Sequence, residues 1–260
     1  MSKLLSQLAG GELTGFILVL ARVTPLFLVA PLFSSAMLPA RVRGIVAVAI
    51  SLGLTSVALR GEHVPSSALP LIGLIAENLL TGLGFAFSFA VLFAAVESAA
   101  GFVDGLSGFS LGSMINPMSG AEGSGPFTSL YSVFGTLIFL VIGGDEWVLA
   151  GIAKTFKLVP LTSGPQINSL VGGAEQSFAT VFTSAAEIVA PVMLALLVTD
   201  VAFGVVSRVV PQLNVFGVGF PMKIAVTLLL VSATLPFVAG WISDQLSSSV
   251  GAALTALHVA

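Results

Sequence analysis

The apolar run LIGLIAENLLTGLGFAFSFAVLFAAVESAAGFV, residues 71–103, decides the fold class of this chain. An α-helix rises about 1.5 Å per residue, so about 20 apolar residues in helical form cross a hydrocarbon core of roughly 30 Å. The run exceeds that length, and Glu77 and Glu97 bracket nineteen residues without a charge. It therefore predicts a helix that spans a membrane.

The composition of the whole chain agrees with this prediction. Of its 260 residues, 56% are hydrophobic and 8% are charged, whereas about 25% of the residues in an ordinary soluble domain are charged. These values exclude a soluble enzyme domain and a disordered tail, and nine lysines and arginines are too few for a nucleic-acid-binding protein. The absence of cysteine excludes a disulfide scaffold, a cysteine metal site and a thiol nucleophile. The predicted fold class is an all-α integral membrane protein.

Six further apolar runs bring the prediction to five to seven helical segments. These runs are residues 14–33, 44–59, 127–142, 147–153, 177–199 and 224–243. Several are short or contain proline, as at Pro25 and Pro191, which predicts kinked and broken helices. Lysine and arginine do not alternate between the loops as the positive-inside rule requires. Either a partner orients the chain, or its helices are not simple lipid-facing spans.

Charged side chains lie within or against these apolar runs. They are Arg22, Glu77, Glu97, Glu187, Asp200, Arg208 and Lys223. A charge in hydrocarbon costs several kcal/mol, so such residues face protein or water. Arg22 and Glu187 lie deep in their runs and favour an aqueous pathway or ion pairs between subunits. Those near run ends, Arg208 among them, are also compatible with snorkelling to an interface.

No catalytic or cofactor site is predicted. The acidic residues are scattered, whereas general acid–base pairs converge on a substrate and metal sites group their ligands. The sequence contains neither a phosphate-binding glycine loop nor a Gly-x-Ser-x-Gly nucleophile turn. We therefore predict a protein that is not an enzyme and has no cofactor or metal.

The segment DGLSGFSLGSMINPMSGAEGSGP, residues 104–126, combines a connector composition with apolar side chains. Eleven of its 23 residues are glycine or serine, which is typical of a mobile connector. An apolar loop inside a membrane assembly can plug a pore, but it can also pack once as a re-entrant loop or mediate close helix contact. The candidate plug and gate residues are Gly105, Gly108, Phe109, Leu111, Gly112, Met114, Ile115 and Met118.

A second unusual segment is VVPQLNVFGVGFPMK, residues 209–223. Its prolines bound a stretch that is too short to span, and Gln212 and Asn214 lie among apolar residues. Polar amides at membrane depth need partners, so we expect an internal turn or a broken helix at a subunit contact. The alternative is a plain loop outside the membrane.

This segment closely resembles the hallmark of the flagellar biosynthetic protein FliR family, of which the SctT-type injectisome subunits share a related form. The matching positions are Pro211, Gln212, Leu213, Asn214, Val215 and Phe216, followed by Gly219, Phe220, Pro221, Met222 and Lys223. Two further regions agree in the expected order, Ala21-Arg22-Val23-x-Pro25 with Pro31, and residues 105–126. The motif expected at a subunit contact therefore comprises Pro211, Gln212, Asn214, Phe216, Gly219, Pro221 and Lys223.

The resemblance implies a pore and gate subunit of the type III protein export apparatus. Such a subunit assembles with FliP-like, FliQ-like and FlhB-like subunits in the bacterial inner membrane, within the flagellar basal body, and unfolded flagellar substrates pass through the pore. The implied fold is one membrane-embedded domain over residues 1–260, made of kinked helical hairpins that stack in a helical multi-subunit gate. In the family, the loop corresponding to residues 105–118 closes the pore.

A small secondary transporter or channel subunit is the competing function. Such proteins also use broken helices and intramembrane charges. A transporter is expected to contain internal repeats and to work alone or as a homo-oligomer, whereas the two halves of this chain show no convincing self-similarity. An export-gate subunit is expected to purify together with other small membrane proteins.

Overall fold

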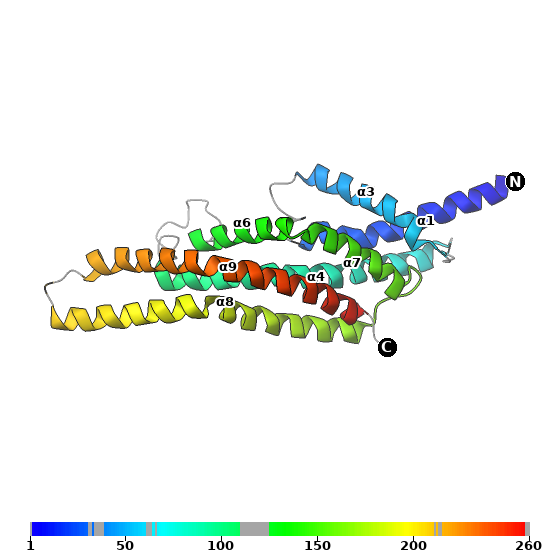
Figure 1. Ribbon diagram of the computed structural model, residues 1–260. Helices are drawn as coiled ribbons and strands as arrows, with labels where there is room; N and C mark the ends of the chain where they lie inside the picture. The colour runs from blue at the N-terminus through cyan, green and yellow to red at the C-terminus, as the bar shows by residue number, and fades with distance from the viewer. Residues whose placement is uncertain are drawn as a thin grey trace. The chain divides into compact units, whose positions relative to one another are not determined.

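Helices make up the fold of this computed structural model, which describes residues 2–30, 33, 39–60, 64–65, 67–109, 125–210, 212 and 215–257. The helices are α1 (Ser2–Val29), α3 (Ala40–Ala58), α4 (Ala68–Ser107), α6 (Pro126–Val141), α7 (Gly144–Leu158), α8 (Ile167–Val209) and α9 (Val215–Leu257) (Figure 1). Within these residues no strand occurs. Five helices are long and apolar enough to cross a membrane, and α6 and α7, bent by 69°, make a sixth if they form one span. The predicted all-α membrane fold class is confirmed.

Two compact units divide the chain. The first comprises residues 1–92, 142–178 and 245–260, and the second comprises residues 93–141 and 179–244. Helices α4, α8 and α9 each contribute residues to both units. That the chain forms a single domain stays a prediction.

The longest helices extend well beyond the apolar runs that predicted them. Helix α8 begins at Ile167 and α9 at Val215, and each contains 43 residues. At about 1.5 Å per residue each is roughly 65 Å long, about twice the hydrocarbon core. Pro191 lies inside α8 and Pro221 inside α9, so neither proline ends its helix. Hydropathy marked only the apolar middle of each helix.

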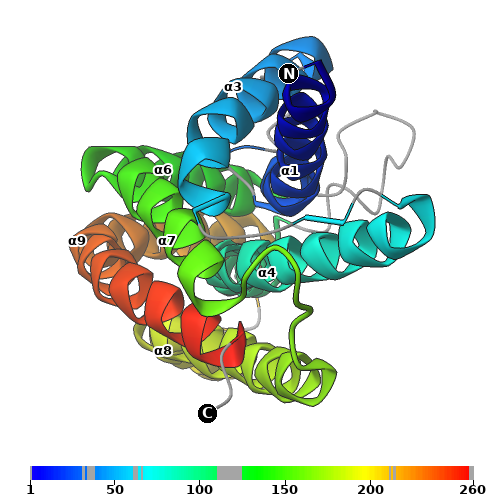
Figure 2. The same cartoon turned by 90° about the vertical axis from the view of Figure 1, so that its right-hand side faces the viewer.

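In the first unit, α1 packs against α3, and α3 contacts α7 (Figure 2). Leu18, Val23, Phe85 and Ile152 are fully buried in its core. Close approach of α4 to α1 depends on Gly82, where a β-carbon would overlap the backbone carbonyl of Arg22. The sequence thus places a glycine where the two backbones nearly touch.

In the second unit, the end of α4 packs against α6. The centres of the Phe93 and Phe139 rings lie 5.6 Å apart. A β-carbon at Gly135 would lie 3.8 Å from the Phe93 ring, which is an ordinary contact distance. The Ser132 hydroxyl donates to the Glu97 carboxylate at 3.0 Å. This bond gives Glu97 a partner on α6 instead of leaving it to snorkel from α4.

Candidate functional site

Arg22 lies at the centre of a buried polar cluster in the first unit. Its side chain is 0% exposed. Nε donates to Oδ1 of Asn78 at 2.9 Å, and Nη1 donates to the carbonyl oxygens of Thr155 at 3.1 Å and Val159 at 2.7 Å. Nη2 reaches the carbonyl oxygen of Pro160 at a longer 3.4 Å. One guanidinium therefore joins α1 and α4 to the end of α7.

The position of the guanidinium explains how a charge can be buried there. Thr155 lies in the last turn of α7, which ends at Leu158, and Val159 and Pro160 follow directly, so the guanidinium faces the negative end of the helix dipole. The guanidinium also lies 4.6 Å from the centre of the Phe156 ring, within cation–π range. Asn78 in turn donates to the carbonyls of Leu74 and Leu161, at 2.8 and 3.0 Å, which fixes the acceptor for Arg22. Arg22 thus caps α7 from another helix.

Sequence reasoning identifies Arg22 but not the residues that surround it. The contacts described above are neutral oxygens and an aromatic face, so an acidic partner on this or another chain stays a prediction. Asn78 is fully buried within a strongly apolar helix. A buried amide in an apolar run needs partners of its own, and that signal, directly after Glu77, is present in the sequence.

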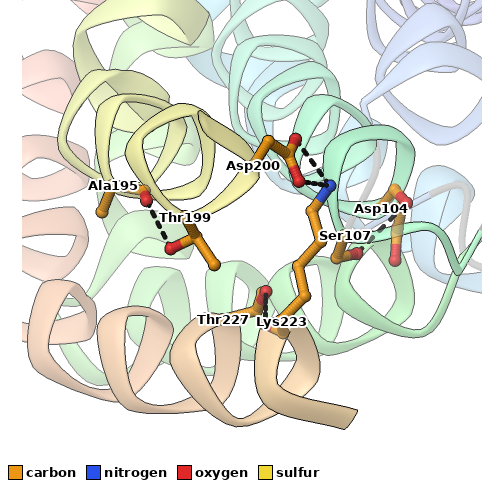
Figure 3. Close-up of polar contacts among 7 residues, drawn as sticks. All are labelled: Asp104, Ser107, Ala195, Thr199, Asp200, Lys223 and Thr227. Atoms are coloured by element: carbon orange, nitrogen blue, oxygen red, sulfur yellow. Dashed lines mark hydrogen bonds and ion pairs between the residues drawn. The ribbon is translucent and has the colours of Figure 1, made fainter. Parts of the chain in front are cut away.

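The remaining intramembrane charges are less enclosed in the single chain. Glu77 packs against the loop after α7, where its Cδ would lie 2.8 Å from a β-carbon at Gly164. Glu187 in α8 and Arg208 in the last turn of α8 are exposed. Asp200 accepts an ion pair from Lys223 of α9, with Nζ–O distances of 2.7 and 2.8 Å (Figure 3).

The two ends of the glycine-rich segment meet at Asp104 in the second unit. Its carboxylate is 3% exposed and accepts bonds from the backbone N–H groups of Phe127 at 3.0 Å and Thr128 at 2.8 Å. The Thr128 hydroxyl donates to the same carboxylate at 2.7 Å. A β-carbon at Gly125 would overlap this carboxylate. Asp104 therefore caps the N-terminus of α6 from the end of α4.

The candidate plug residues divide between the described and undescribed parts of the chain. Helix α4 runs to Ser107, so Gly105 lies in its last turns and not in a loop, which corrects the boundary that the sequence pattern predicts. Gly108 follows with φ of 89°, a conformation that favours glycine. The Phe109 ring contacts the Phe127 ring edge-on at 5.6 Å. Leu111, Gly112, Met114, Ile115 and Met118 lie outside the described residues.

The hallmark motif spans the α8–α9 connection and the start of α9. Gln212 is exposed in a turn, whereas Pro211 and Asn214 lie outside the described residues. Phe216, Gly219, Pro221 and Lys223 all belong to α9, and Gly219 is buried. The buried hydrogen bonds expected for Gln212 and Asn214 concern the assembled complex and stay a prediction.

Comparisons with known proteins agree with the hallmark motif. Bacterial export proteins, family 1, match residues 13–249. The flagellar biosynthetic protein FliR of Bacillus subtilis (strain 168) is 30% identical over 223 residues, 83% of this chain and 84% of that protein. FliR of Escherichia coli (strain K12) is 26% identical over 220 residues, 85% of this chain and 84% of that protein. The surface presentation of antigens protein SpaR of Shigella flexneri is 28% identical over 210 residues, 79% and 78% of the two chains.

The match to the family covers most of the chain and includes every element described above except the ends of α1 and α9. Two of these relatives are named flagellar biosynthetic proteins, and the third is named a surface presentation of antigens protein. The FliR-family resemblance is thereby confirmed, and this membrane protein belongs to the bacterial export proteins, family 1.

Proposed function

We propose that this chain is a non-catalytic pore and gate subunit of the type III protein export apparatus, which passes unfolded flagellar substrates across the bacterial inner membrane. Membership of the export family supports a secretion apparatus subunit. The observation that carries the gate role is the buried Asp104 carboxylate, which ties the two ends of the glycine-rich segment to one point.

A seal needs a rigid frame and an apolar element that the frame holds in place. The frame here is the end of α4 and the start of α6, joined by three hydrogen bonds to Asp104. Between them, residues 110–124 contribute Leu111, Met114, Ile115 and Met118 to the sequence. Apolar closure of a narrow pore works by excluding water and requires no charged gate residue.

An exposed acidic residue on an otherwise apolar surface of the single chain supports a multi-subunit assembly. In the single chain, 11% of the most apolar stretch of α3 is buried, and the corresponding values are 22% for α8 and 17% for α9. Glu187 is exposed within α8, and a carboxylate at that depth must face protein or water and not lipid. The proposed FliP-like, FliQ-like and FlhB-like partners would cover these surfaces.

Co-purification of the tagged chain tests the proposal. The expected result is a stoichiometric complex with FliP-like and FliQ-like subunits, whose yield falls several-fold for Glu187→Ala. Glu175→Ala is the matched control, because Glu175 is also exposed on α8 but lies in its polar first turns. Purification of the chain as a homo-oligomer that moves small solutes would favour the transporter instead.

A further inference from the structure

The hallmark motif contacts the base of the glycine-rich segment within the same unit. The Phe109 ring lies 5.6 Å from the Phe127 ring of α6 and 6.4 Å from the Phe220 ring of α9. Both separations fall in the range of favourable aromatic pairs, and the interplanar angles of 76° and 56° are edge-on and tilted. Phe109 therefore joins three helix ends that are far apart in the sequence.

Each helix that holds Phe109 is itself anchored by charge. Asp104 binds the N-terminal N–H groups of α6, which fixes Phe127. Lys223, one turn after Phe220 in α9, pairs with Asp200 of α8 at 2.7 Å, and Figure 3 shows its long side chain extended from α9 to the carboxylate. The two aromatic partners of Phe109 are thus held by two different polar contacts, Asp104 with the start of α6 and Lys223 with Asp200.

The ring of Phe109 lies at the point where the chain leaves α4. Gly108, with φ of 89°, turns the backbone out of α4, and Phe109 is the next residue. A ring held on two sides sets the direction in which the chain leaves the helix. We propose that Phe220 is a positioning residue that holds the ring of Phe109, so that the hallmark segment 219–223 sets the direction in which the chain leaves α4 and is not only a contact between subunits. This inference rests on the proposed function for its effect on the pore.

A spin label near Phe109 measures how firmly the end of α4 is held in the assembled complex. The chain contains no cysteine, and the space that a β-carbon would occupy at Gly105 is open, so Gly105→Cys gives a single attachment point for a nitroxide in the last turns of α4. The variants are Phe220→Ala, Phe109→Ala and their double variant, with Phe220→Tyr as the form that retains the ring. Phe237→Ala is the matched control, because Phe237 is an exposed phenylalanine of α9, 55% exposed against 44% for Phe220.

If Phe220 positions Phe109, we expect the following results. Phe220→Ala and Phe109→Ala each increase nitroxide mobility and raise the resting ion conductance several-fold, and the double variant adds nothing to either single variant. Phe220→Tyr and Phe237→Ala behave like the parent. Unchanged mobility in Phe220→Ala overturns the inference, as does additive behaviour or a complex that fails to assemble, which would make Phe220 a subunit contact. If Phe220→Ala increases nitroxide mobility but not conductance, Phe220 still positions Phe109, and the proposed pore function is contradicted.

Discussion

Replacement of Arg22 by alanine removes the charge that caps α7, and its cost follows from the bonds. Three acceptors lie within 3.1 Å of the guanidinium, on Asn78, Thr155 and Val159. The Thr155 carbonyl keeps the bond from the Val159 N–H at 2.9 Å, so two acceptors lose their donor. At about 1–3 kcal/mol for each of these two unsatisfied buried acceptors, we expect a loss of about 2–6 kcal/mol.

Such a loss is a large part of a typical total stability of about 5–15 kcal/mol. For a chain of this size it corresponds to a fall in Tm of roughly 4–24 °C, measured by thermal unfolding of the detergent-solubilised complex, together with a reduced yield of that complex. Arg22→Lys is expected to be intermediate, because one ammonium cannot match the planar fork of donors. Arg41→Ala, at an exposed arginine of α3, is the control. Parental Tm and yield for Arg22→Ala would refute the capping role.

Two further variants test the helix contacts of each unit. Gly82→Ala places a β-carbon on the Arg22 carbonyl and is expected to destabilise the chain by about 1–3 kcal/mol. Gly73→Ala, where the space is open, is the control and is expected to be neutral or stabilising. Equal Tm values for the two variants would contradict the close approach of α4 to α1. Asp104→Ala removes the cap of α6, and the expected loss of about 1–3 kcal/mol accelerates hydrogen exchange of the Thr128 amide about 5- to 150-fold. Unchanged exchange would show that the cap is dispensable.

The helices are predictable because their apolar middles exceed the length that a membrane span requires. Their ends are not, because the first turns of α8 are polar and a helix outside the hydrocarbon core leaves no hydropathy signal. Proline is also a poor guide. Pro191 and Pro221 are residues that usually break or kink helices, yet both lie inside continuous α-helix.

The candidate site is predictable only as single residues. Arg22 stands out as a charge in an apolar run, but its acceptors lie 56 to 138 positions away along the chain. The sequence pattern places Asp104 at the start of a loop, whereas it is the cap that closes one. The Gly125-Pro126 pair before an apolar run does mark a helix start, but nothing local indicates that the capping carboxylate comes from the preceding helix. Contacts of this kind follow from packing and not from sequence pattern.

Ion conductance shows directly whether the segment after α4 closes a pore, as we propose. Conductance is measured in bilayers that contain the intact complex, without substrate, for the parent and for a deletion of residues 108–115. A variant with Leu111, Met114 and Ile115 replaced by serine keeps the length of the segment and serves as the matched comparison. We expect both variants to assemble and both to conduct ions at rest, whereas the parent does not. Assembly with unchanged conductance in both variants would contradict this expectation and would place the seal in another subunit.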